Sequence, residues 1–272
     1  MTNISQIYCE PTITVLVPAA GRSGQTWLCY MLAHLLNARF IEPYCLLRGI
    51  LHSGLPYILD LTHGDLPGRS LTSYSLVVKT HELPDPYLSL TRKIILIVRD
   101  PRDMVTSAWY RYYVMKTTGS DLEDDAQNLV LTDKPIKNNK TLKSRLWSLI
   151  YGNRTLAITL SARKWAIFSA AWRDLPFTHV VRYEDLLQRP YETMAEICRY
   201  LELPENPDQI NDTLHKLSFK EITGRKPGQE QTKNISFRKG TVGDHKSKLS
   251  PFELQLISYF CKEEAKHYGY QL

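Results

Sequence analysis

The chain has 272 residues, of which 43% are hydrophobic and 23% charged, so it can bury the core of an ordinary globular protein. Its 34 Lys and Arg residues outnumber its 28 Asp and Glu residues, which gives a net charge of +6. This mild basicity suits an anionic ligand, but there is no basic stripe, zinc spacing or aromatic-basic RNA motif, so we expect no nucleic-acid partner.

The cysteines and the apolar segments bear on where the protein works. Five cysteines show no paired spacing, and an odd number predicts a reducing compartment. Cys29 and Cys198 fall in helical patterns and are predicted to be core thiols. The N-terminus lacks the basic flank of a signal peptide, and no apolar stretch approaches the ~20 residues of a membrane span. We therefore expect a cytoplasmic protein with no membrane span.

Residues 12–37 predict a strand, a loop with two glycines and a helix. Thr12–Val17 is a β-branched apolar run, and apolar residues recur at helical spacing from Trp27 onward. The small and polar segment between them contains Arg22. In this geometry backbone N–H groups and the positive end of a helix dipole converge, which suits a phosphate. The Gly-Lys-Ser/Thr ending of a nucleotide P-loop is missing, and the motif alone is of low specificity.

Residues 38–74 predict a connecting region with one short helix and no visible chemistry. Ser75–Val78 predicts a second strand, which is followed directly by Lys79 and His81. Polar residues at the end of a buried strand of an α/β protein lie where ligands bind. The alternative is that both are solvated residues at a strand exit, and this pattern alone leaves the two readings open.

Lys93–Val98, with the sequence KIILIV, is the strongest predicted strand. Because it is continuously apolar, both faces should be covered and the sheet should be parallel. Asp100 can cap the helix that follows. Arg99 at the strand end and Ser107 two turns along the helix could hold a phosphate from two sides. The alternative is that the arginine pairs with Asp103 and the serine lies on an exposed face.

The middle of the chain is less regular. Residues 112–146 contain an acidic and a basic run and predict a solvated segment. Trp147–Trp172 has a helical composition, and its predicted apolar positions are Trp165, Ile167, Phe168 and Trp172.

Thr178–Val181 predicts a further strand, and Pro190 opens a helix with a periodic apolar face. A polar loop over 224–236 leads into Arg238, Lys239 and Gly240. Two cations beside a flexible glycine let side chains and backbone N–H groups converge on one phosphate, although a basic turn of this kind is usually only solvated. Ser250 begins the last helix with a capping box.

Taken together, these motifs resemble the PAPS-dependent sulfotransferases, where PAPS is 3′-phosphoadenosine 5′-phosphosulfate. The matching segments, in order, are Pro18-x-x-Gly-Arg-Ser-Gly-Gln-Thr-Trp27, Lys79-Thr-His81, Arg99-Asp-Pro-Arg-Asp103 with Ser107, Tyr183-Glu-Asp-Leu186 and Arg238-Lys-Gly-Thr-Val-Gly-Asp244. The resemblance extends from about Ile13 to Lys246. It implies a single α/β sulfotransferase domain over 1–272, with a central parallel sheet flanked by helices and a P-loop-like strand–loop–helix.

The resemblance also implies transfer of a sulfuryl group from PAPS to a hydroxyl or amine, with adenosine 3′,5′-bisphosphate (PAP) as product. His81 would be the general base, with Lys79 and Arg22 neutralising charge on the leaving phosphate. The 5′-phosphosulfate would be held by Arg22, Ser23, Gly24, Gln25 and Thr26. The 3′-phosphate would be held by Arg99, Ser107, Arg238, Lys239 and Gly240. The adenosine would be bordered by Trp27, Tyr183, Ser218 and Phe219. No metal is required.

Three departures from the family pattern matter. Arg22 stands where many cytosolic members have lysine, so its role should be purely electrostatic. His245 stands where tryptophan is usual, and the dimer segment of many cytosolic members is not found after Lys246. The oligomeric state therefore stays open, as does the acceptor, which could be a small molecule, a glycan or a peptide. The alternatives are a P-loop nucleotide or phosphoryl-transfer enzyme and a catalytically silent PAPS- or PAP-binding protein.

Overall fold

The computed structural model describes residues 14–41, 75–84, 91–118, 153–230 and 237–272. The chain divides into two compact units. The first unit comprises Met1–Arg99 and Phe168–Lys226, and the second comprises Asp100–Ile167 and Pro227–Leu272. That the whole chain is one sulfotransferase domain stays a prediction.

The first unit is built on a five-stranded sheet in the order β2-β3-β1-β4-β5, and every neighbouring pair is parallel. The strands are β1 (Thr14–Pro18), β2 (Arg39–Ile41), β3 (Leu76–Thr80), β4 (Lys93–Val98) and β5 (Thr178–Arg182). The predicted α/β class with a parallel sheet is confirmed. Because parallel strands end at the same edge, the loops that follow β1, β3 and β4 begin close together.

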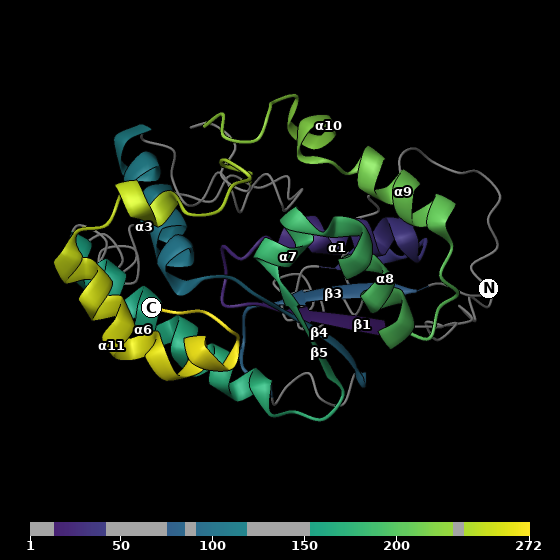
Figure 1. Ribbon diagram of the computed structural model, residues 1–272, viewed down its shortest axis with the longest axis horizontal. Helices are drawn as coiled ribbons and strands as arrows, with labels where there is room; N and C mark the ends of the chain where they lie inside the picture. Colours follow the sequence, from purple (N-terminus) through teal and green to yellow (C-terminus); the bar gives the residue numbers. More distant parts are fainter. Residues whose placement is uncertain (1–13, 42–74, 85–90, 119–152, 231–236) are drawn as a thin grey trace, which may run out of the picture. The chain divides into compact units, whose positions relative to one another are not determined.

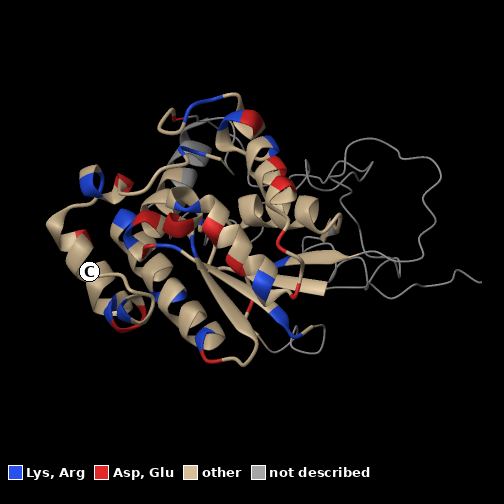
Figure 2. Cartoon of the chain, turned by 45° about the vertical axis from the view of Figure 1, so that its right-hand side comes forward, with Lys and Arg blue, Asp and Glu red and all other residues tan. Residues whose placement is uncertain are grey.

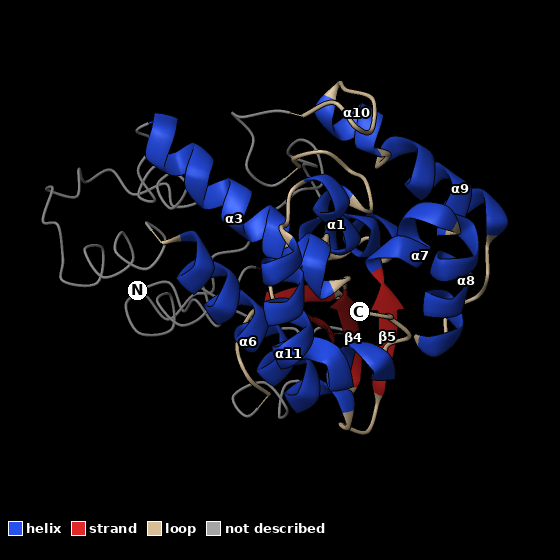
Figure 3. Ribbon diagram, turned by 60° about the vertical axis from the view of Figure 1, so that its left-hand side comes forward, coloured by secondary structure: helices blue, strands red, loops and turns tan. Residues whose placement is uncertain are grey.

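The first unit contains the helices α1 (Gln25–Leu35), α7 (Tyr183–Gln188), α8 (Pro190–Tyr200), α9 (Pro207–Lys216) and α10 (Phe219–Thr223). Of these, α1, α7 and α8 contact this sheet, α9 packs on α1 and α8, and α10 packs on α9 (Figures 1 and 3). Alternate strand residues such as Val15, Val17 and Ile95 share one core with apolar residues of α1 and α8. The helix predicted from Pro190 is confirmed, and its core face includes the buried Met194 and Ile197.

The second unit contains α3 (Pro101–Thr118), the 3-10 helix η1 (Asp244–Ser247) and α11 (Pro251–His267), together with most of α6 (Arg154–Arg173). Asp100 caps α3 as predicted, because its carboxylate accepts the Arg102 N–H at 2.9 Å. The predicted capping box of α11 is also present, with Ser250 and Glu253 bonded reciprocally.

Several predicted elements differ from the structure. The predicted first strand begins at Thr12, which lies outside the described residues, and β1 ends at Pro18. The connecting region predicted over 38–74 contains β2, and its remainder lies outside the described residues. Of the solvated segment predicted over 112–146, residues up to Thr118 belong to α3 and the rest is not described.

Two further predictions need correction. The strand predicted to end at Val78 continues to Thr80, because Lys79 and Thr80 pair with Val17 and Pro18 of β1. Ile167, predicted as an apolar position of its helix, is 50% exposed. The buried residues of α6 recur at steps of three and four, as at Trp165, Phe168 and Trp172, and Ile167 lies off that stripe.

The predicted burial of two cysteines is confirmed by the structure. Cys29 and Cys198 are buried thiols, as predicted, and so is Cys261. Burial, with the nearby charge of Asp100, raises the pKa of Cys261 to about 12, so this thiol is unreactive. Both signs of charge occur along the helices (Figure 2). Within the described ranges, no helix combines the length and the apolar character that crossing a membrane requires.

Candidate active site

The loop after β1 turns sharply and opens directly into α1. Gly21, Arg22 and Gly24 have φ values of 94°, 55° and 79°, all in the left-handed region. Gly24 is the residue before the helix, and no side chain caps that end. The first N–H groups of α1, which include those of Gln25 and the half-buried Thr26, have no carbonyl partner within the helix. They are therefore available for an anion, where the helix dipole also favours negative charge.

Gly24 is required by its surroundings as well as by its backbone angle. A Cβ atom at this position would lie within 3 Å of two ring carbons of Tyr183. The guanidinium of Arg99 covers the same ring at 4.5 Å from its centroid and donates to the Arg22 carbonyl at 3.1 Å. Thus two of the predicted site residues, Arg99 and Tyr183, hold the loop in place.

His81 lies one residue beyond β3, beside the loop. Its Nδ1 is 2.8 Å from the carbonyl oxygen of Ala19. Because a carbonyl can only accept, Nδ1 carries a hydrogen, and in the neutral ring Nε2 is then the nitrogen with the lone pair. The ring carbon Cε1 is 4.0 Å from the Cβ position that Gly21 would have. Lys79, half-buried, lies in β3 two residues before His81.

The side chains of Ser23 and Gln25 form hydrogen bonds with backbone carbonyls of the protein itself. The Ser23 hydroxyl donates to the Gly21 carbonyl at 3.1 Å. The side-chain amide of Gln25 donates to the carbonyls of Val17 at 2.5 Å and Thr80 at 2.8 Å. What these two residues can offer a bound anion is therefore their backbone N–H groups.

The residues predicted to border the adenosine gather in the first unit. The indole N–H of Trp27 donates to the Leu217 carbonyl at 2.6 Å, and its ring meets that of Tyr183 edge-on at 6.4 Å between centroids. Phe219 is buried beneath the Arg225 guanidinium, which is 5.3 Å from its ring centroid. The hydroxyl of the intervening Ser218 caps α10 by accepting from Glu221 N–H at 3.3 Å.

In the second unit, one face of α3 meets the Arg-Lys-Gly loop. The buried Asp103 accepts from the Gly243 N–H at 2.6 Å and from the His245 N–H at 3.0 Å. Two turns along the helix, the ring of Tyr110 stacks on Arg238 at 4.8 Å. Ser107, also buried, lies between them at the spacing of one helical turn from each. The structure thus brings Ser107 and the basic loop to the same helix face.

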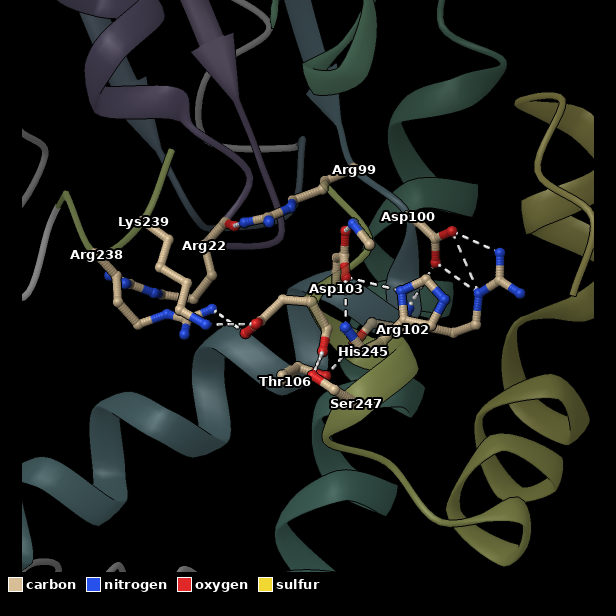
Figure 4. Close-up of polar contacts among 12 residues, drawn as sticks. Arg22, Arg99, Asp100, Arg102, Asp103, Thr106, Arg238, Lys239, His245 and Ser247 are labelled. Carbon is tan, nitrogen blue, oxygen red and sulfur yellow. Dashed lines mark hydrogen bonds and ion pairs between the residues drawn. The ribbon is translucent and has the colours of Figure 1, made fainter. Parts of the chain in front are cut away.

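The two cations of this loop form ion pairs with two carboxylates (Figure 4 labels both cations). Arg238 donates to Glu230 at 2.7 Å and to Asp244 at 2.6 Å, and Lys239 donates to Asp244 at 2.7 Å. The neighbouring Gly240 has a φ of 63°.

Burial and ion pairing act in opposite directions on these groups. Burial by itself would raise the pKa of Glu230 and of Asp244, but hydrogen bonds and charge from Arg238 and Lys239 outweigh it and hold both values below the usual range. Burial raises the pKa of Tyr110, as do the charge of Glu230 and a hydrogen bond to it.

Sequence reasoning missed the pair formed by Asp103 and His245. The His245 Nδ1 is 2.7 Å from an Asp103 carboxylate oxygen, and both side chains are buried (Figure 4). The sequence suggested Asp103 only as an alternative partner of Arg99. The two residues are 142 positions apart, so only the unusual histidine after Gly-Asp could have drawn attention to the contact.

Comparisons with known proteins identify relatives of this chain. The chain is similar to a 3-beta-hydroxysteroid sulfotransferase of Cavia porcellus, with 24% identity over 271 residues, 95% of this chain and 85% of that protein. It is also similar to cytosolic sulfotransferase 9 of Arabidopsis thaliana, with 23% identity over 301 residues, 98% of this chain and 82% of that protein.

Solved structures share the fold. The mouse sulfotransferase SULT7A1 complexed with PAP has a TM-score of 0.57 at 15% identity, covering 95% of this chain and 86% of its own. A retinol dehydratase in complex with androsterone and PAP has a TM-score of 0.54 at 16% identity, covering 93% and 80%. The sulfotransferase domain family model matches residues 13–269. The chain therefore belongs to the sulfotransferase domain family, and the predicted family and class of enzyme are confirmed.

Proposed function

We propose that this protein transfers a sulfuryl group from PAPS to a hydroxyl or amine of an acceptor, with His81 as the general base. The observation that carries the proposal is the hydrogen bond from His81 Nδ1 to the Ala19 carbonyl, 2.8 Å long. In the neutral ring this contact places the lone pair on Nε2, beside a loop that offers backbone N–H groups to an anion. A base must be both correctly placed and correctly protonated, and this contact provides for the second requirement.

The residues present fit PAPS, which carries two separate phosphate groups. We assign the 5′-phosphosulfate to the loop of the first unit, with Arg22 and the N–H groups of Gly24 to Thr26, because a helix start without a capping side chain is an anion site. We assign the 3′-phosphate to Arg99, Ser107 and the Arg238-Lys239-Gly240 loop. Trp27, Tyr183, Ser218 and Phe219 are assigned to the adenosine.

When bound, PAPS supplies a sulfuryl group that is already attached to a good leaving group. The chain's residues then have two tasks. His81 Nε2 takes the proton of the acceptor hydroxyl as its oxygen forms the new bond to sulfur in line with the departing phosphate oxygen. Lys79 and Arg22 stabilise the negative charge that develops on that phosphate oxygen as its bond to sulfur breaks. Since arginine stays protonated, Arg22 acts through charge alone.

For the acceptor we propose a small-molecule hydroxyl. One similar protein is named for hydroxysteroids, and one solved neighbour holds androsterone. A screen with labelled PAPS against phenols, alcohols, sugars and peptides tests this assignment, and exclusive labelling of peptides or sugars would contradict it. Location in the cytoplasm remains a prediction from the cysteine pattern, and the buried thiols support it.

The cofactor assignment is tested by thermal unfolding with nucleotides. We expect PAP to raise the melting temperature, because a ligand that binds only the folded state stabilises it in proportion to its affinity. ATP at equal concentration should have no effect, since it lacks the 3′-phosphate. Equal shifts, or no shift with PAP, would contradict the assignment and favour a phosphoryl-transfer enzyme or no nucleotide site.

The assignment of the base is tested by His81→Ala. Sulfuryl transfer should fall by roughly 10²- to 10⁴-fold, the usual contribution of general base catalysis. The dissociation constant of PAP should stay unchanged, because His81 is placed to serve the acceptor. His34→Ala is a suitable control, as that histidine contacts Thr213 at the other end of α1. Retention of most activity in His81→Ala would remove His81 from the mechanism, and a wild type that binds PAP but transfers nothing would be a silent binding protein.

A further inference from the structure

The side chain of Gln25 joins the ends of two neighbouring strands. Gln25 is the first residue of α1 and is only 3% exposed. Its amide nitrogen donates to the carbonyl of Val17 near the end of β1, at 2.5 Å, and to the carbonyl of Thr80 at the end of β3, at 2.8 Å. One side-chain amide thereby holds both strands at the point where the loop and His81 leave the sheet.

A continuous set of hydrogen bonds links this amide to His81. The Thr80 carbonyl accepts a second bond, from the Ala19 N–H at 3.1 Å. The carbonyl of the same Ala19 accepts from His81 Nδ1 at 2.8 Å. Val17, Ala19 and Thr80 are all fully buried, so water cannot readily replace the amide if it is removed. The position of the Ala19 carbonyl, and with it the tautomer of His81, therefore depends on Gln25.

We propose that Gln25 is a positioning residue for His81. By fixing the end of β3 against the start of the loop, it keeps the hydrogen of His81 on Nδ1 and the lone pair of Nε2 beside the loop. Glutamine is suited to this task because its NH2 group has two N–H donors and no charge. The inference rests on the proposed function of His81, and it assigns the Gln25 side chain to the base rather than to the phosphosulfate.

The test is Gln25→Met, which keeps the length of the side chain and removes both donors. In ¹⁵N-histidine NMR spectra of the wild type, His81, assigned by its loss in His81→Ala, should show a protonated Nδ1 and an unprotonated Nε2. In Gln25→Met we expect the ring to populate both tautomers. Sulfuryl transfer should fall by about 10²-fold, as when a reacting group is misplaced by about 1 Å, and it should stay low at PAPS concentrations that saturate the variant, because the defect then lies in the base.

The matched control is Gln209→Met. Gln209 also donates its side-chain amide to a backbone carbonyl, that of Leu35 at 2.8 Å; Leu35 is the last residue of α1 and lies at the opposite end of the helix from Gln25. This variant loses one bond from a side-chain amide to a carbonyl of α1, at a more exposed position and away from His81, so it shows whether loss of such a bond elsewhere affects the ring. Its His81 resonances should match those of the wild type.

A folded Gln25→Met protein with wild-type His81 resonances and wild-type transfer would overturn the proposal. If Gln25→Met does not fold, Gln25→Asn serves instead, because it keeps the amide but is one methylene too short to reach both carbonyls; the same tautomer change is expected. A wild type in which Nε2 carries the hydrogen would also overturn it. If PAP does not bind the wild type, the proposed function is contradicted. The role of Gln25 is then decided by the His81 spectra of the wild type and of Gln25→Met.

Discussion

The two predicted phosphate-binding motifs are held in place by different forces. In the first unit, the loop from Gly21 to Thr26 is fixed by packing and by hydrogen bonds to backbone carbonyls. The Gln25 amide bonds to two strand carbonyls, the Arg99 guanidinium bonds to the Arg22 carbonyl, and Gly24 packs against Tyr183. In the second unit, Arg238 and Lys239 are fixed by ion pairs with Glu230 and Asp244.

This difference has a physical consequence for each motif. An anion at the first loop meets N–H groups that need no rearrangement, so binding there depends on the shape of the backbone. An anion at the second motif meets cations that already have carboxylate partners, so binding there depends on the exchange of charges and on salt. The first motif should be sensitive to steric changes, and the second to changes of charge and pH.

The largest effect on the first motif is expected from Gly24→Ala. The new methyl group would clash with the ring of Tyr183, and alanine disfavours a φ of 79°. We expect a loss of about 3 kcal/mol in the free energy of unfolding, from strain and overpacking together. Binding of PAP should be lost in titration calorimetry because the first N–H groups of α1 are displaced.

Gly224→Ala is the matched control for this prediction. Gly224 has a similar φ of 67°, but a methyl group there would meet no atom within 4 Å. It should cost about 1 kcal/mol, the backbone contribution alone, and leave PAP binding intact. Equal effects of the two substitutions on binding would show that packing of the loop on Tyr183 does not shape the site.

Arg238→Ala should have a smaller effect on stability, and it should weaken PAP binding because a positive charge is lost. The guanidinium is 7% exposed and pairs with two carboxylates, so its removal leaves Glu230 and Asp244 without this partner. We expect a loss of roughly 3 kcal/mol or less in unfolding free energy and a 10- to 100-fold weaker dissociation constant for PAP.

The control for Arg238→Ala is Arg154→Ala, also in the second unit. Arg154 pairs with Glu253 at 2.5 Å and stacks on Trp109 at 5.5 Å, so it resembles Arg238 in its contacts without belonging to the basic loop. Its substitution should cost about 1 kcal/mol, since the side chain is 40% exposed, and leave PAP affinity unchanged. An unchanged PAP affinity in Arg238→Ala would exclude its role at the 3′-phosphate.

The smallest effect is expected from Glu230→Gln. On the proposed assignment of Arg238 and Lys239 to the 3′-phosphate, Glu230 would compete with that phosphate for both cations. Its neutralisation should therefore tighten PAP binding by a few-fold, roughly the free energy of one partly exposed ion pair. Because the pKa of Glu230 is lowered on folding from 4.5, its pair contributes stability above pH 4.5 that is lost as pH falls through the folded-state pKa.

Urea unfolding between pH 7 and pH 3 tests this pH dependence. The unfolding free energy of Glu230→Gln should fall less between pH 7 and pH 3 than that of the wild type, because the variant has no Glu230 carboxylate to protonate. The remaining fall includes the contribution of Asp244, whose pKa is also lowered. PAP affinity that is weaker in Glu230→Gln than in the wild type would show that Glu230 supports the cations rather than competing for them.

Local sequence patterns were sufficient for the elements of the first unit that bury apolar runs. Lys93–Val98 is a strand as predicted, because a continuous β-branched run has few other ways to bury both faces. The strand end after Val78 was misplaced, since Lys79 looks like a loop residue until its pairing with Val17 is known. β2 was not predicted because its three residues are too few to show a hydrophobic periodicity.

The sequence by itself determined the family, the parallel α/β fold and the residue types available for chemistry, because motif spacing and apolar periodicity are local properties. Only the tertiary structure decided what each side chain does. It turned Gln25 from a loop residue into a link between two strands, paired His245 with Asp103, and joined His81 Nδ1 to the Ala19 carbonyl. These contacts join residues 8 to 142 positions apart, and hydrogen-bond geometry over such separations exists only once the strands and helices have packed.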